Sequence, residues 1–410
     1  MGTVESAHIA TRPPATRWAV VAVYAAALTA STATFLAYAA VAPRVGAAFG
    51  VSEAAVGNLA LLSPLSLVLL GPVSGRLLDR RFETTLAVGA AMIAVGPLVR
   101  LVDPSSYGWA LAGQVLLTSG TPFVANAITK YPARYFSAQE RPTVIALLSA
   151  SFYVGVLVAA IAGPPLYESG GISRLVAFHA TIGVAAGTAL LIMVAVVRVP
   201  AVVAEPGPAF VRGRLRRTRE LWLLAGVISG LFGLFNAFIA WIETVEDHLG
   251  NAGFGGPLVI ALTLGGVTGA ITVPGLAAKR DARRTVLIAI GVVQVVGLLA
   301  IAATGSRVIL LVLAVIVGFF MMAALPVAFE WSEIHAGTAN AASATAFLSI
   351  LGNLGGVAFV LAPQLVLDSP RSVFILLAAL SIPGVLAAVR LPQTPTPHCV
   401  ALANTAASNH

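Results

Sequence analysis

The stretch Gly75–Arg81, GRLLDRR, is a charged turn between two long apolar runs. The stretch Gly275–Asp281, GLAAKRD, occupies the same place between two further apolar runs, 200 residues later. Pro122 and Pro326 are related by a similar spacing. Repeated landmarks of this kind predict two similar halves, related in membrane proteins by an axis along the membrane normal.

The composition indicates that this chain is surrounded by lipid rather than by water. Hydrophobic residues make up 58% of it and charged residues 10%, which is too little charge to cover the surface of a soluble domain. A soluble enzyme is therefore excluded. The net charge of +8 is spread over short basic clusters between apolar runs, so nucleic acid is not an expected partner. Cys399 is the only cysteine, and neither a metal site nor a cofactor is expected.

Apolar runs long enough to cross a bilayer recur twelve times. They cover 18–41, 55–75, 84–102, 109–129, 142–163, 175–197, 221–242, 256–277, 284–303, 308–331, 338–362 and 371–391. The sequence thus predicts an all-α integral membrane protein of twelve transmembrane helices in two pseudo-symmetric six-helix bundles.

The basic residues predict the orientation. With the N-terminus inside, nineteen of the 24 Lys and Arg residues fall on the cytoplasmic side. The other side holds Arg44, Arg100, Arg174, Arg307 and Arg371. Since positive charge favours the cytoplasmic side, we expect a multi-pass protein of the plasma (inner) membrane with both termini in the cytoplasm.

The longest internal polar stretch, Arg198–Glu220, separates six spans from six. The expected organisation is a cytoplasmic tail over 1–17, bundles over 18–197 and 221–391, a linker over 198–220 and a second tail over 392–410. The linker's arginines could bind acidic lipid headgroups, although the simpler interpretation, a solvated positive-inside loop, is favoured.

The turn after the second span resembles the signature loop of the major facilitator superfamily of transporters. Gly75, Asp79 and Arg80 stand at matching positions, whereas Phe82 replaces a second glycine. A glycine lets helices approach closely, and an Asp–Arg pair at a helix end can lock one half and release it. We therefore interpret Gly75, Asp79 and Arg80, with Gly275 and Arg280 in the second half, as a conformational gate. An ordinary charged turn would explain the arginines but not the repeat.

Shorter stretches resemble one branch of that superfamily. Leu77–Arg81, Thr121–Asn126 and Leu325–Glu330 are similar to the feline leukaemia virus subgroup C receptor-related transporters. That branch is associated with choline, ethanolamine and haem-related transport. Phe35 stands where that family has a tryptophan in its choline site, and Tyr153 replaces a glutamine, so the substrate itself is not implied.

Three kinds of residue within the predicted spans are suited to a solute. Phe35, Tyr38 and Tyr153 offer aromatic faces to a cation. Asn126, Asn236 and Asn353 could line a cavity or equally bond helices together. Glu330 could pair with a cationic substrate, accept a coupling proton, or lie as a plain charge at the cytoplasmic end. These seven are the predicted substrate-binding residues.

Basic residues suited to an anion are not expected at mid-span depth, because Arg100 and Lys130 lie at span ends. His179 is interpreted as an interior histidine with bonded nitrogens, or as a proton relay. We therefore expect a small organic substrate, cationic or zwitterionic rather than anionic, with a proton or sodium ion as a further partner. The protein is expected to be a monomer surrounded by membrane lipids.

Two other functions remain open. The first is a proton-coupled drug or metabolite efflux antiporter, although such antiporters of the superfamily commonly carry an arginine in the fourth span, and none lies over 109–129. The second is a membrane sensor or scaffold that transports nothing, which would have an occluded centre without a polar cavity.

The expected topology can be tested with single cysteines in a Cys399→Ser background. Both bundles are expected to flank one central cavity. Cysteines near Gly170 and Gly207 should be labelled by an impermeant reagent from opposite sides of the membrane, since Gly170 lies in an expected outer loop and Gly207 in the expected cytoplasmic linker. Labelling of both positions from the same side would contradict the twelve-span topology.

Overall fold

The computed structural model describes residues 14–51, 53–137, 139–197, 218–251, 254–337, 340–366 and 369–396. Most of the predicted linker over 198–220, and much of the tails over 1–17 and 392–410, lies outside these residues. Every regular element in the described ranges is a helix. Since a bilayer core offers no water to backbone N–H and C=O groups, helices that satisfy these groups internally are what the composition requires.

The predicted spans correspond to eleven long helices, of which one contains two spans. They are α1 (Pro14–Phe35), α3 (Glu53–Arg80), α4 (Phe82–Val99), α5 (Tyr107–Ala125), α7 (Arg141–Val196), α8 (Arg219–His248), α9 (Gly255–Lys279), α10 (Arg283–Ala303), α11 (Arg307–Ala336), α12 (Ala341–Leu361) and α13 (Pro370–Val389). Within the described residues, nine of the helices are long and apolar enough to cross a membrane. α3 and α5 fall outside the nine, and α7 counts once.

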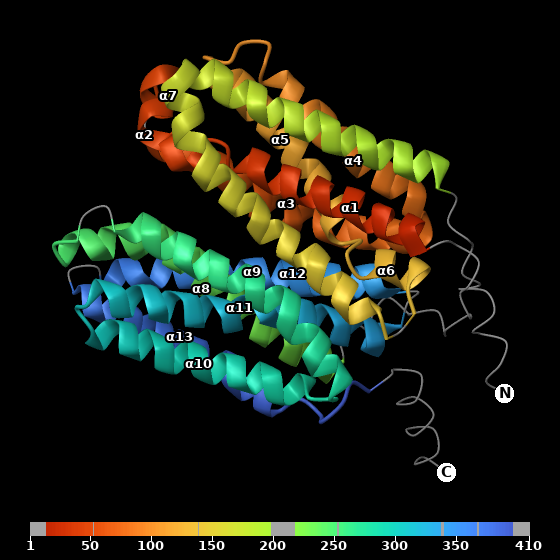
Figure 1. Cartoon of the computed structure of the whole chain (residues 1–410), viewed down its shortest axis with the longest axis vertical. Coiled ribbons are helices and arrows are strands. Elements are labelled where there is room, and N and C mark those ends of the chain that lie inside the picture. The colour runs from red at the N-terminus through yellow and green to blue at the C-terminus, as the bar shows by residue number, and fades with distance from the viewer. Residues whose placement is uncertain are drawn as a thin grey trace. The chain divides into compact units, whose positions relative to one another are not determined.

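α7 contains the fifth and sixth predicted spans, joined by a sharp bend. Gly170 and Gly171 depart from helical dihedral angles, and the two arms of α7 diverge from this point (Figure 1). Gly171 has φ 63°, in the left-handed region where a side chain would be strained, so a glycine suits the bend. The predicted spans 142–163 and 175–197 lie on either side of it.

Two short helices lie where no element was expected. After α1 ends at Phe35, a 3-10 turn, Ala39–Val41, leads into α2 (Ala42–Phe49). α2 has a proline in its first turn and ends at Gly50, which has φ 67°. α6 (Lys130–Tyr135) follows α5 after a turn. A remaining 3-10 segment, η5 (Ala362–Leu365), follows α12.

The packing of the helices divides the chain into two compact units. Unit 1 comprises Met1–Glu140 and Ser151–Val203, and unit 2 comprises Arg141–Ala150 and Ala204–His410. The boundary at Val203 falls inside the stretch expected to be a linker, and the first ten residues of α7 group with unit 2. Apart from these ten residues, the two units correspond to the two halves of the sequence.

Small residues let the helices of unit 1 pack closely. α4 packs along α5 and α3 packs against α5, as Figure 1 also shows for α4 and α5. A Cβ added at Gly96 of α4 would lie 2.6 Å from the backbone nitrogen of Leu117 in α5. The rings of Tyr24 and Tyr131 stack with centroids 4.6 Å apart, and the Tyr24 hydroxyl donates a hydrogen bond to the Val124 carbonyl.

In unit 2 the closest approach joins α9 and α11. A Cβ at Gly269 of α9 would collide with the Phe319 carbonyl oxygen, and one at Gly318 of α11 would collide with the Leu262 carbonyl oxygen. Gly265, one turn before Gly269, meets Val315 in the same way. Lipid gives little hydrophobic drive for helix association, so this close backbone packing stabilises the pair.

Gly269→Ala should therefore destabilise the protein. The added methyl group meets a backbone oxygen that no side-chain rotation can move, so we expect a loss of about 1–3 kcal/mol or more. Gly230→Ala is the matched control, because Gly230 is also buried in a helix but nothing lies within 4 Å of its added Cβ. Thermal unfolding of both variants in detergent should show a lower melting temperature for Gly269→Ala alone; equal melting temperatures would contradict the close α9–α11 packing.

Candidate functional site

The predicted gate residues of unit 1 lie around a buried ion pair. Asp79, one residue before the end of α3, accepts a hydrogen bond from Lys130 of α6 at 2.9 Å, and both side chains are largely buried. The expected partner of Asp79 was an arginine of its own turn, but Arg80 is exposed. Gly75 is buried one turn before Asp79. The pair thus connects the end of α3 to the segment that follows α5.

Asn126 completes this part of unit 1. It caps the C-terminus of α5 and is fully buried, and its amide nitrogen donates a hydrogen bond to the Ser74 hydroxyl at 2.8 Å. Its amide oxygen is buried and has no hydrogen-bond partner among the described residues. Asn126 therefore joins α5 to α3 next to the Asp79–Lys130 pair, and it keeps one acceptor for another group.

Unit 2 also has a buried ion pair, in which the base comes before the acid along the chain. Glu330 of α11 accepts hydrogen bonds from Arg283 at 3.1 Å and 2.6 Å, and Asp281 accepts a further one at 3.1 Å. Arg283 begins α10, directly after the charged turn that carries Arg280. Glu330 is 3% exposed, and one oxygen of its carboxylate pairs with an arginine that the sequence did not single out. Its second oxygen has no partner among the described residues.

The remaining gate residues of unit 2 lie at the end of α9. Gly275 is partly exposed, and its added Cβ would lie 3.5 Å from the hydroxyl of Thr143, a residue that groups with unit 2. Arg280 is the exposed residue at the C-terminal cap of α9. The structure therefore places the ion-pairing role of this turn on Arg283.

Asn236 and Asn353 lie together, on the helix pair α8–α12. A Cβ at Gly356 of α12 would lie 3.1 Å from the Asn236 amide nitrogen. Asn353, one turn before Gly356, is buried and bonds the Ser349 carbonyl of its own helix at 2.8 Å. In unit 1, Tyr153 of α7 is buried. Of these residues, Asn236 lies against the neighbouring helix, whereas the hydrogen bond of Asn353 stays within its own helix.

Phe35 and Tyr38 lie beside a buried arginine that was predicted to lie at a span end. Arg100 caps the C-terminus of α4 and is 1% exposed. It donates hydrogen bonds to the Thr34 carbonyl at 3.0 Å and to the Gln114 side chain, and its guanidinium lies 5.4 Å from the centre of the Tyr38 ring. Gln114 in turn donates to the Phe35 carbonyl at 3.0 Å.

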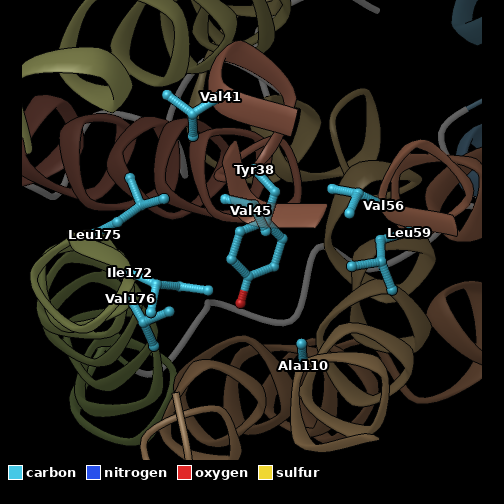
Figure 2. Packing of buried hydrophobic residues seen from close by; sticks show 9 residues of the cluster. All are labelled: Tyr38, Val41, Val45, Val56, Leu59, Ala110, Ile172, Leu175 and Val176. Atoms are coloured by element: carbon cyan, nitrogen blue, oxygen red, sulfur yellow. The ribbon is translucent and has the colours of Figure 1, made fainter. Parts of the chain in front are cut away.

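Tyr38 is at the centre of an apolar cluster. Figure 2 shows its ring between Val45 of α2, Leu59 of α3 and residues of the second arm of α7, among them Ile172. The Tyr38 hydroxyl has no hydrogen-bond partner among the described residues. The ring is therefore held in apolar packing on one side and faces the guanidinium of Arg100.

Several of these residues could not be chosen from the sequence. Lys130 and Arg100 were assigned to span ends, where they do lie, but their burial was not expected. His179 is buried as expected, yet neither ring nitrogen has a partner in the described ranges. Arg283 lies two residues after the charged repeat Gly275–Asp281, and this closeness is the signal that could have identified it. No group of three His, Cys, Asp or Glu side chains suited to a metal ion is found in the part of the chain that the structure describes.

Two relatives of this chain are named as transporters. It is 23% identical over 398 residues to the human choline/ethanolamine transporter FLVCR2, covering 88% of this chain and 74% of that protein. It is 28% identical over 246 residues to CynX, a cyanate transport protein of Escherichia coli strain K12, covering 58% of this chain and 62% of that protein.

Solved structures agree on the fold. The Escherichia coli fucose:proton symporter FucP superposes with a TM-score of 0.73 at 15% identity, over 91% of this chain and 98% of that one. The human organic anion transporter MFSD10 gives a TM-score of 0.73 at 14% identity, over 92% and 100%.

The family model of the Major Facilitator Superfamily matches residues 23–360. Together with the apolar helices, this match makes the protein a multi-pass integral membrane protein, and it points to a transporter rather than an enzyme. The all-helical fold and the transporter resemblance expected from the sequence are thereby confirmed. Because the match extends over most of its length, the chain belongs to the Major Facilitator Superfamily.

Proposed function

We propose that this protein is a secondary active transporter, which carries a small organic solute across the plasma membrane by alternating access with both termini in the cytoplasm. The observation that carries the proposal is the family match over residues 23–360, joined by likeness to a named transporter over 88% of the chain. Members of this family bind small molecules, in some cases together with an ion. We propose a proton or a sodium ion as the coupling ion.

The solute is proposed to be a cation or a zwitterion. Phe35 and Tyr153 in unit 1 supply electron-rich rings of the kind that recognise quaternary and primary ammonium groups, whereas the Tyr38 ring, expected from the sequence to join them, already faces the Arg100 guanidinium. FLVCR2, a relative whose match covers 88% of this chain, is named for choline and ethanolamine. Asn126, Asn236 and Asn353 are proposed to add hydrogen bonds, and Glu330 a negative charge.

Binding and flux measured together test this function. Purified protein is screened by thermal shift against choline, ethanolamine, glycine betaine, acetate and a drug panel, since a ligand of the folded state raises the melting temperature. Compounds that bind are then offered to proteoliposomes with and without a proton or sodium gradient. Binding without flux would favour a sensor, and gradient-driven exchange of drugs would favour an efflux antiporter.

Neutralising the unit 2 ion pair should weaken the binding of a cationic solute. Glu330→Gln alone leaves Arg283 buried with only Asp281, and breaking a buried pair in this way costs stability. The double variant Glu330→Gln/Arg283→Gln removes both charges and leaves no buried charge without a partner. We expect it to melt near the parent temperature. It should bind the preferred amine about tenfold more weakly, because it lacks the carboxylate oxygen of Glu330 that has no partner among the described residues and could bond an ammonium group.

The matched control is Glu168→Gln, which removes a carboxylate from the exposed pair with Arg44. Its effect on affinity should be small, because exposed pairs contribute little. If the double variant binds the amine with parent affinity, or if carboxylates outrank amines in competition, Glu330 has no role in a cation site.

The proposed gate predicts an effect of Asp79→Asn on conformation. The substitution removes the charge that pairs with the largely buried Lys130, which weakens the contact of α3 with α6 and lowers stability, without a change in side-chain size. We expect the populations of inward-open and outward-open states to shift while the protein still folds, since a difference of a few kcal/mol separates such states.

Distances between spin labels on the cytoplasmic loops measure these populations. Glu83→Gln is the control: Glu83 forms a longer, 3.5 Å pair with Arg134 and its side chain is 55% exposed. An identical distance distribution in Asp79→Asn and the parent would remove Asp79 from the gate.

A further inference from the structure

Arg100 is a buried cation whose counter-charge is not a carboxylate. Within the described residues, its two terminal nitrogens donate to the Thr34 carbonyl and to the Gln114 side chain, and no acidic side chain forms an ion pair with it. Carbonyl and amide oxygens carry only partial negative charge. An ionised group removed from water costs several kcal/mol unless a full charge compensates it, so the site lacks one negative charge.

Three buried side chains around this cation keep polar atoms without a partner among the described residues. They are the Nε of Arg100, the hydroxyl of Tyr38 and both ring nitrogens of His179. Arg100, Tyr38 and His179 are each at most 2% exposed. Buried polar atoms in proteins are nearly always bonded, and a cluster of unbonded ones indicates a small polar group that they bind.

These side chains are connected through one residue of α1. Thr34 accepts the hydrogen bond of Arg100 through its carbonyl, and its hydroxyl donates to the His179 carbonyl at 3.4 Å. Tyr38 lies one turn further along, with the guanidinium 5.4 Å from its ring centre. The cluster of Thr34, Tyr38, Arg100, Gln114 and His179, called here the Arg100 cluster, lies wholly in unit 1.

The charge of the ligand that would bind these atoms follows from the groups around it. The face of Tyr38 that would hold a solute cation already faces the guanidinium, so a second cation would meet like charge there. The Nε–H of Arg100 and the Tyr38 hydroxyl are donors, and one nitrogen of a neutral imidazole also donates. Three donors and one net positive charge suit a monoanion of few atoms, and the apolar residues around Tyr38 strengthen such an interaction by excluding water.

We propose that Arg100, Tyr38 and His179 form a buried binding site for a small monoanion in unit 1. The shared chemistry is a compact single negative charge, which either the carboxylate of a solute or an inorganic ion such as chloride supplies. The site does not rest on the proposed function, because anion binding is measured without flux. Anion binding can be found in a protein that shows no transport, and transport can be found in a protein that does not bind the anion.

The experiment uses the purified full-length protein in a buffer whose only other anion is a bulky sulfonate. Sodium formate and sodium chloride are titrated separately at constant ionic strength, and the melting temperature is recorded. We expect a saturable rise of about 3 °C or more with at least one of the two ions. A response to formate alone assigns the site to a carboxylate, and a response to chloride alone or to both assigns it to an inorganic ion.

Tyr38→Phe is the decisive variant. Its hydroxyl lies close to the Arg100 guanidinium but has no described acceptor for its own proton, so the change should lower the melting temperature without added anion only slightly. It should weaken anion binding about tenfold, the effect of one hydrogen bond to a charged group. Arg100→Gln should abolish the response, and Arg174→Gln, at an exposed arginine of α7, should retain it.

The proposal is overturned if neither ion raises the melting temperature at constant ionic strength, or if Tyr38→Phe responds to both ions with parent affinity. The second criterion holds even where Arg100→Gln fails to fold, since Tyr38→Phe keeps the guanidinium and removes only the hydroxyl.

Discussion

An ionised side chain inside apolar packing needs a counter-charge or well-oriented dipoles, because its transfer out of water costs several kcal/mol. Among the described residues, three of the places where this constraint applies meet it in different ways. Asp79 with Lys130, and Glu330 with Arg283, are pairs of opposite charge. Arg100 is held by a carbonyl oxygen, an amide oxygen and an aromatic face. The positions of α3 against α6 and of α10 against α11 depend on the first two.

The two pairs occupy related places in the sequence but have reversed signs. In unit 1 the acid follows the second span and the base follows the fourth; in unit 2 the base follows the eighth span and the acid lies in the tenth. The repeat that began with Gly75–Arg81 and Gly275–Asp281 therefore preserves a site for an ion pair rather than particular residues. A substitution that removes the acid affects each unit differently, since the base left behind is a lysine in unit 1 and an arginine in unit 2.

The spans were predictable because burial in a bilayer leaves a strong signal in the sequence. Each long helix overlaps a predicted run, and even the bend at Gly170–Gly171 falls between two predicted spans. α2 and α6 were not expected, because eight and six residues are too few to give an apolar period, and tertiary contacts maintain them. Partners were the least predictable: which neighbour Asp79, Glu330 or Arg100 meets depends on the rotation of each helix about its axis, and apolar residues on every face leave that rotation unspecified.

Close glycine contacts in unit 2 bear on how it can change shape. Gly265, Gly269 and Gly318 bring the backbones of α9 and α11 together, and Gly355 does the same for α12 against Ser229 of α8. Backbones in such contact cannot slide past one another without a collision of main-chain atoms. Each pair is therefore expected to move as one body. A rearrangement inside unit 2 is then expected where the two pairs meet, at α8 with α9 and α11 with α12, or where α10 and α13 pack against them.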